Sequence, residues 1–172
     1  MGIDLTPSSQ AEEELEIFLR EHQNEFYRLA YSYVKNADEA LDVVQEAAIK
    51  AFVHRSSLRN PQNMKAWFYR ILVNESLSWL RRNRRMYTVP SDYLEGMQSE
   101  ERTERFDENL DLYKAVLQLD PKLRTVVLLR FFEGMKLEDI AVVTNARLST
   151  VKTRLYRALK ELKTMLGEEI SA

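Results

Sequence analysis

Near the C-terminal end, one stretch carries side chains whose types and spacing suit binding to a nucleic acid. Lys152 and Tyr156 are four residues apart, and so are Thr153 and Arg157. A helix would place them on one face, because residues four apart are neighbours on a helix surface. Arginine and lysine can donate to guanine O6 and N7, while threonine and tyrosine can reach bases or phosphates. The candidate DNA-binding residues here are Lys152, Thr153, Tyr156, Arg157 and Lys160.

The surrounding sequence, KLEDIAVVTNARLSTVKTRLYRALKEL (136–162), predicts a helix-turn-helix. A short apolar helix ends at the polar break Thr144-Asn145, and a second helix carries the basic face. In this motif the second helix enters the major groove and the first crosses the backbone. The alternative is a solvated basic face on a bundle helix. We favour DNA binding because the break, the apolar spacing and the basic face occur together. The second helix is predicted to bury Val151, Leu155, Leu159 and Leu162.

A second basic helix is predicted for residues 64–85. The helix opens with the aromatic run WFY (67–69). Trp67, Phe68, Ile71 and Leu72 should belong to the core, as aromatic residues at helical spacing usually do. Arg70 and Asn74 should lie outside. The helix closes with the run RRNRR (81–85). These cations either suit the C-terminus of a helix or hold phosphates, and the spacing leaves both interpretations open.

An acidic cluster lies on a third predicted helix, which Asn36 and Glu39 would open as a capping box. Asp42 and Glu46, one turn apart, could do acid–base work or bind a metal. No histidine, nucleophile or glycine-rich loop lies nearby in the sequence to complete such a site. A solvated face, shared with Gln45, is the simpler interpretation, and a docking surface for a basic partner is a third. The residues predicted to point inward are Leu41, Val44, Ala48, Ala51 and Phe52.

The composition narrows the class of protein. The 172 residues include four glycines, four prolines and no cysteine, which excludes disulfides and thiolate metal ligands. Strand-like alternation is absent, so the predicted fold class is all-α. No apolar run approaches the roughly 20 residues that a membrane span needs, and residues 1–14 do not resemble a signal peptide. We expect a cytoplasmic protein without a cofactor. Its net charge of −2 would not by itself suggest DNA.

The helical pattern is interrupted at residues 86–108, which contain one proline, one glycine, many charges and few apolar side chains. We interpret this segment as a flexible linker between two small helical domains. In the second domain, Asp120-Pro121 predicts the start of a helix, and Gly134 predicts its end. The predicted domains are residues 10–85 and residues 109–166.

Two pairs of motifs give the chain a resemblance to a known family. The first pair is DVVQEAAIKAF (42–52) and AWFYRILVNESLSWLRRNRR (66–85). The second pair is LDPKLRTVVLLRFFEGMKLEDIA (119–141) and STVKTRLYRALKEL (149–162). In this order and spacing, the chain resembles a bacterial extracytoplasmic-function (ECF) sigma factor, the small two-domain branch of the sigma-70 family.

The resemblance implies a promoter-specificity factor and not an enzyme. Its implied partners are core RNA polymerase, promoter DNA and an anti-sigma factor, without membrane insertion. The face of Asp42, Gln45 and Glu46 would dock on the polymerase clamp helices. Some of the apolar residues Val127, Leu128, Phe131 and Phe132 would face the flap. The helix-turn-helix would read the −35 element, and the loop 55–64 with the helix after it would read the −10 element, where an unstacked base is captured. The implied −10 residues are Arg55, Asn63, Arg70, Asn74, Arg81, Arg82, Arg84 and Arg85.

The turn of the helix-turn-helix departs from the family pattern. Leu-Gly is usual where this chain has Thr144-Asn145, but asparagine tolerates the left-handed backbone that the turn needs. Arg147 stands where a small N-cap is usual, so we expect Ser149 to cap the second helix and to shift its start. The main alternative function is that of a dimeric helix-turn-helix regulator on a palindromic operator. Two basic helices on different domains argue against it.

Overall fold

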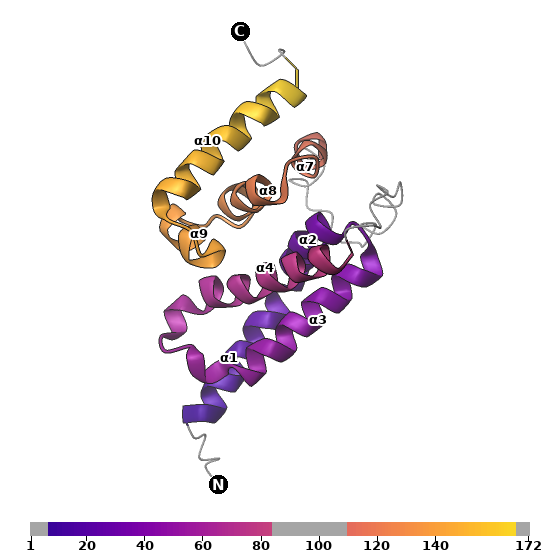
Figure 1. Cartoon of the computed structure of the whole chain (residues 1–172). Coiled ribbons are helices and arrows are strands. Elements are labelled where there is room, and N and C mark those ends of the chain that lie inside the picture. The colour runs from indigo at the N-terminus through magenta and orange to yellow at the C-terminus, as the bar shows by residue number, and fades with distance from the viewer. Residues whose placement is uncertain (1–6, 84–109, 168–172) are drawn as a thin grey trace.

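The structure is a computed structural model that describes residues 7–83 and 110–167 (Figure 1). All regular elements in these two ranges are helical, which confirms the predicted all-α class. The predicted linker at 86–108, together with Arg84 and Arg85, lies outside the described residues. The first unit consists of α1 (Pro7–Glu21), α2 (Gln23–Val34), α3 (Ala37–Val53), the 3-10 turns η1 (Arg55–Ser57) and η2 (Pro61–Asn63), and α4 (Met64–Arg82).

Aromatic rings and an ion pair between α3 and α4 help to hold the first unit together. The ring centroid of Phe26 in α2 lies 4.5 Å from that of Phe68 in α4, and Phe18 of α1 contacts both rings. Large buried rings supply much of the apolar area in a small core. The ammonium of Lys50 in α3 donates to the carboxylate of Glu75 in α4. These contacts orient α4 relative to α1, α2 and α3.

The junction between α2 and α3 follows the predicted cap. α2 ends at Lys35, whose backbone is left-handed with φ 54°. The side chain of Asn36 then accepts a hydrogen bond of 3.0 Å from the backbone N–H of Glu39, so this half of the capping box is confirmed. The Glu39 carboxylate accepts instead from the indole Nε1 of Trp79 in α4, at 2.8 Å. The cap therefore also ties α3 to α4.

Two predictions for the first unit are wrong. Leu41 was expected to point inward, but it is 55% exposed. Small side chains face the core instead, because they let α3 pack closely against α2 and α4. The helix predicted to reach residue 85 ends at Arg82, where the Asn83 side chain donates to the carbonyl oxygen of Trp79 at 2.9 Å. The residues of α3 that are buried are Ala40, Val43, Ala47 and Ala51.

The second unit contains the predicted turn glycine and asparagine. Gly134 has φ 65°, so it follows the preceding helix in the left-handed conformation that glycine tolerates. Asn145 has φ 50° and ψ 44°, which confirms the predicted left-handed turn. The elements of this unit are α7 (Leu110–Val116), α8 (Pro121–Val127), the π-helical turn η3 (Leu128–Phe132), α9 (Leu137–Thr144) and α10 (Leu148–Met165).

The expected shift in the start of the last helix does not occur. α10 begins at Leu148, with Arg147 in the N-cap position and Ser149 already inside the first turn. The backbone sets this start, because the carbonyl oxygen of Arg147 accepts the first helical bond, from the N–H of Val151 at 3.0 Å. The prediction that Ser149 caps the helix is therefore wrong.

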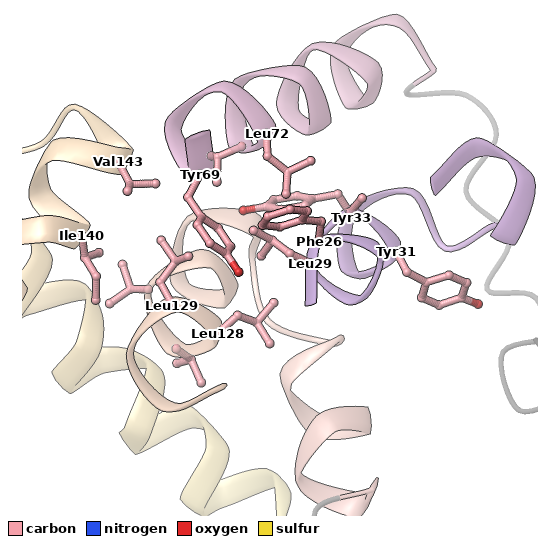
Figure 2. Close-up of a cluster of buried hydrophobic side chains, with 14 of the residues drawn as sticks. Phe26, Leu29, Tyr31, Tyr33, Tyr69, Leu72, Leu128, Leu129, Ile140 and Val143 are labelled. Atoms are coloured by element: carbon pink, nitrogen blue, oxygen red, sulfur yellow. The ribbon is translucent and has the colours of Figure 1, made fainter. Parts of the chain in front are cut away.

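The two units share one apolar core (Figure 2). Tyr69 and Leu72 of α4 belong to the same buried cluster as Leu129, Ile140 and Val143, which come from the second unit. Among the helix pairs, α4 and α9 make one of the most extensive contacts. The first helix of the helix-turn-helix thus packs directly against the helix that was predicted to contact the −10 element.

Candidate nucleic-acid interface

The recognition face of α10 is built from the residues that the sequence indicated. Lys152, Thr153, Tyr156, Arg157 and Lys160 are all exposed, and Tyr156 has the largest exposed fraction among the exposed large apolar side chains of the described ranges, 76%. Val151, Ala158 and Leu162 form the buried face. Leu159, which was predicted to be buried, is 43% exposed, and Ala158 takes its place in the core.

Two contacts hold side chains on this face. The Thr153 hydroxyl donates to the carbonyl oxygen of Ser149 at 2.9 Å. The Arg157 Nε lies 3.7 Å from a carboxylate oxygen of Glu161, one turn further along. Both partners are exposed, so this ion pair is weak and can be exchanged for a phosphate or a base edge. The face presents hydrogen-bond donors together with one large aromatic ring.

A second cationic face runs along α4. Arg70, Asn74 and Arg81 are exposed, and their spacing of four and seven residues places them along one side of the helix. Arg82 is exposed at the helix end, and Arg84 and Arg85 lie outside the described residues. The cations Arg81 and Arg82 lie in the last turn, where they also favour the negative end of the helix dipole. The face is available for phosphates.

The loop before α4 is ordered by local hydrogen bonds. The indole Nε1 of Trp67 donates to the Ser57 hydroxyl at 2.9 Å, and Asn60 accepts from the N–H of Gln62 at 3.0 Å. Asn63 is exposed. Trp67, which was predicted to belong to the core, is half-buried, packs against the core and also positions the loop.

Arg55, at the start of this loop, already has protein partners. Its guanidinium donates to the carbonyl oxygen of Phe52 at 2.6 Å and lies 2.9 Å from the Glu12 carboxylate of α1. Beside it is an open hollow lined by Ala11, Val53, Arg55, Ser56 and Leu58. Contact with DNA would require Arg55 to give up an exposed ion pair.

The acidic face of α3 is wider than predicted. Asp42, Gln45 and Glu46 are exposed together. Large apolar side chains flank them on the same helix, and those are exposed as well. In the described ranges, His, Asp and Glu side chains do not gather in groups of three or more that could hold a metal. The face combines carboxylates with an apolar stripe, and the apolar members are Leu41, Ile49 and Val53.

A buried polar cluster around Glu133 was absent from the sequence predictions. Glu133 follows η3 and its side chain is only 3% exposed. Its carboxylate accepts from the Tyr69 hydroxyl at 2.7 Å and from the Arg28 guanidinium at 3.1 Å. The Lys65 ammonium donates to the Glu133 carbonyl oxygen at 2.7 Å. No local pattern reveals this cluster, because the three donors are 64 to 105 residues away from Glu133 in the chain.

A second group of polar contacts lies between α2 and α8. The Thr125 hydroxyl donates to the carbonyl oxygen of Pro121, so its contact with Tyr33 has the tyrosine hydroxyl as donor. The Arg124 guanidinium donates to the carbonyl oxygen of Ser32. Burial raises the pKa of Tyr33 to about 12. Burial, reinforced by the Glu133 carboxylate, also raises the pKa of Tyr69. Both tyrosines are therefore protonated donors at neutral pH.

Two helical units, each with an exposed cationic helix face and one with a helix-turn-helix, define a DNA-binding protein. The comparisons with known proteins give its family. Residues 18–86 match the family description "Sigma-70 region 2", and residues 109–162 match "Sigma-70, region 4". The chain belongs to the sigma-70 family and is a sigma factor of the ECF type.

Individual relatives agree with this assignment. The chain is 42% identical over 151 residues to the RNA polymerase sigma factor SigV of Bacillus subtilis, covering 88% of this chain and 90% of the relative. It is 32% identical over 164 residues to the RNA polymerase sigma-H factor of Pseudomonas aeruginosa, covering 88% and 85%. Among solved structures, it matches the sigma factor RpoE of Bartonella quintana, in complex with the anti-sigma factor NepR, with a TM-score of 0.65, 26% identity and coverage of 90% and 99%.

Proposed function

We propose that this protein binds core RNA polymerase and directs it to promoters through two separate DNA contacts. The observation that carries the proposal is that each sigma-70 region presents its own exposed cationic helix face, on α4 and on α10. An operator-binding dimer would need only one reading helix in each chain. Sigma factors are transcription regulators, and we assign no catalytic role to Asp42 or Glu46.

On α10, Lys152, Thr153, Tyr156, Arg157 and Lys160 would contact the −35 element in the major groove. Arg157 is the best candidate for a base contact, because a guanidinium can donate in bidentate fashion to guanine. The Thr153 hydroxyl donates to the carbonyl oxygen of Ser149 at 2.9 Å, and this hydrogen bond fixes the orientation of the hydroxyl oxygen. Lys152 and Lys160 suit phosphates, which position the helix without reading the sequence.

On α4, Arg70, Asn74, Arg81 and Arg82 would line the −10 element. Arg84 and Arg85, which lie outside the described residues, are proposed to contact the same element. Arg55 and Asn63 belong to the proposed base-capturing loop. Capture of an unstacked base needs a pocket or a stacking platform. The hollow beside Arg55 supports this part of the proposal.

The α3 face would dock on the polymerase clamp helices. Asp42, Gln45 and Glu46 supply charge and hydrogen-bond acceptors, while Leu41 and Ile49 add apolar area that a purely solvated face would lack. Of the four apolar residues considered for contact with the polymerase flap, fewer are accessible than expected. Val127 and Leu128 are buried and Phe132 is half-buried, whereas Phe131 is 55% exposed.

The remaining partner and the location follow from the same proposal. An anti-sigma factor would bind this protein, as NepR binds the matched sigma factor RpoE. In the described ranges, none of the helices has both the length and the apolar character needed to cross a bilayer. Action on RNA polymerase would place the protein in the cytoplasm.

Run-off transcription with purified core polymerase tests the proposed function. We expect promoter-specific transcripts only when this protein is added. A charge-reversed variant, Asp42→Lys with Glu46→Lys, should lose polymerase binding and transcription while keeping its helical circular dichroism. The matched control is Glu13→Lys with Glu16→Lys, which reverses two exposed charges on α1. Transcription that is equal with and without the wild-type protein would contradict the proposal.

A further inference from the structure

Glu133 is a point at which several hydrogen bonds join the two units. It receives donors from α2 and from α4 of the first unit: Arg28 and Tyr69 on its carboxylate, and Lys65 on its carbonyl oxygen. The π-helical turn η3 delivers it there, since the Glu133 N–H bonds to the carbonyl oxygen of Leu128, five residues back. A buried carboxylate needs such donors, because desolvation without them is costly.

Further contacts join the two units. The Arg28 guanidinium lies 5.4 Å from the ring centroid of Phe132, and the Tyr113 hydroxyl donates to the carbonyl oxygen of Arg28 at 3.1 Å. Tyr33 donates to Thr125, and Arg124 donates to the carbonyl oxygen of Ser32. Polar contacts with buried members thus accompany the apolar contact between the units. Their strict geometry selects one relative orientation of the two units.

This orientation conflicts with simultaneous reading of two promoter elements. α4 packs on α9 and α9 on α10, so the axes of α4 and α10 lie within about 20 Å, at about 8–10 Å for each packed pair. The 19 residues of α4 add a length of about 28 Å at about 1.5 Å per residue. Elements named −10 and −35 are about 25 base pairs apart, which is about 85 Å of duplex at about 3.4 Å per pair. The closed arrangement cannot span that distance.

We infer that Glu133 is an intramolecular latch, which holds the free protein closed and must release before both reading helices engage one promoter. The need to open before promoter binding rests on the proposed function. The closure by Glu133 concerns the free protein alone and does not depend on that function. Neither reading face is buried by the closure, since Arg70, Asn74, Tyr156 and Arg157 stay exposed. The latch therefore acts through the distance between the faces and not by covering them.

The test is a distance measurement between spin labels on the full chain. The protein has no cysteine, so Glu13→Cys on α1 and Lys163→Cys on α10, both exposed positions outside the proposed contacts, label the two units specifically. In the protein that carries these two cysteines, Glu133→Gln keeps the shape of the side chain and removes its charge. The matched control is Glu16→Gln, which removes the same charge from an exposed ion pair with Arg20 within α1.

We expect a single narrow distance distribution for the parent and for Glu16→Gln, and a clearly broader distribution for Glu133→Gln. Addition of core polymerase and promoter DNA should also move the parent away from its closed distance. A parent-like distribution for Glu133→Gln, or an unchanged parent distance in the promoter complex, would overturn the inference. If circular dichroism shows Glu133→Gln to be unfolded, the same distance measurement is made on Tyr69→Phe and on Thr125→Val. If both variants keep the closed distance, the latch is overturned. Opening in Glu133→Gln without any promoter-specific transcription would contradict the proposed function and leave the latch standing.

Discussion

The two helices proposed to contact DNA differ in what lies behind them. α10 packs mainly on elements of its own unit, chiefly α8 and α9. α4 is enclosed by α2 and α3 on one side and by α9 of the other unit on the next. Because α4 is covered on more sides, its exposed face is narrower than that of α10. α10 is therefore part of a motif within one unit, whereas α4 also connects the two units.

The largest expected difference concerns the buried sides of the two helices. Phe68 of α4 is fully buried against Phe26 and Phe18, so Phe68→Ala should lower the free energy of unfolding by about 3–5 kcal/mol. Leu159→Ala on α10 should cost about 1 kcal/mol or less, because that side chain is half exposed. Urea denaturation followed by circular dichroism measures both. Equal losses would remove the distinction between the helices.

A pair of tyrosines isolates the polar connection. Tyr69→Phe on α4 removes the hydrogen bond to the Glu133 carboxylate. It should lower the free energy of unfolding by about 1.5–3 kcal/mol, the usual range for a hydrogen bond to a charged group. Tyr156→Phe on α10 is the matched control, since that hydroxyl lies on the exposed face, and it should leave the stability of the free protein unchanged. If Tyr69→Phe is as stable as the parent, its bond to Glu133 does not stabilise the closed form.

The DNA contacts should differ in specificity. Arg157→Ala on α10 should weaken promoter binding by the polymerase complex by about 1–3 kcal/mol, through one position of the −35 element. Arg70→Ala on α4 should weaken binding by a similar amount for every −10 sequence and reduce the salt dependence, as expected for a phosphate contact. Binding of the complex to single-base promoter variants separates the two patterns. A uniform loss for Arg157→Ala would reassign that residue to a phosphate.

The smallest expected difference lies in the two left-handed turns. Lys35 of the first unit has φ 54° and Asn145 of the second has φ 50°. Lysine is strained in this conformation, whereas asparagine tolerates it. Lys35→Gly should therefore raise the free energy of unfolding by about 0.5–1 kcal/mol, and Asn145→Gly should change it by less than about 0.5 kcal/mol. The opposite order in chemical denaturation would show that the Lys35 side chain makes a compensating contact.

Prediction from the sequence succeeded where the relevant interactions are short in range. The cap at Asn36, the turn at Asn145 and the exposure of Arg157 each depend on neighbours within a few residues. It failed at Leu41 and Leu159, where several faces of a helix were apolar and packing decided which of them turned inward. Alanines are buried at the helix contacts in place of larger side chains. A local apolar pattern cannot predict this, because it does not contain the distance between packed helices.

The sequence by itself determined the helices, the helix-turn-helix and the family, because periodicity, turn residues and motif order are written along the chain. Only the tertiary structure decided that the two units share a core and that Glu133 joins them, with Arg28 lying 105 residues away. The physical reason is that a buried charge is stable only beside its donors. Folding brings those donors together from separate helices, so no single segment reveals the contact.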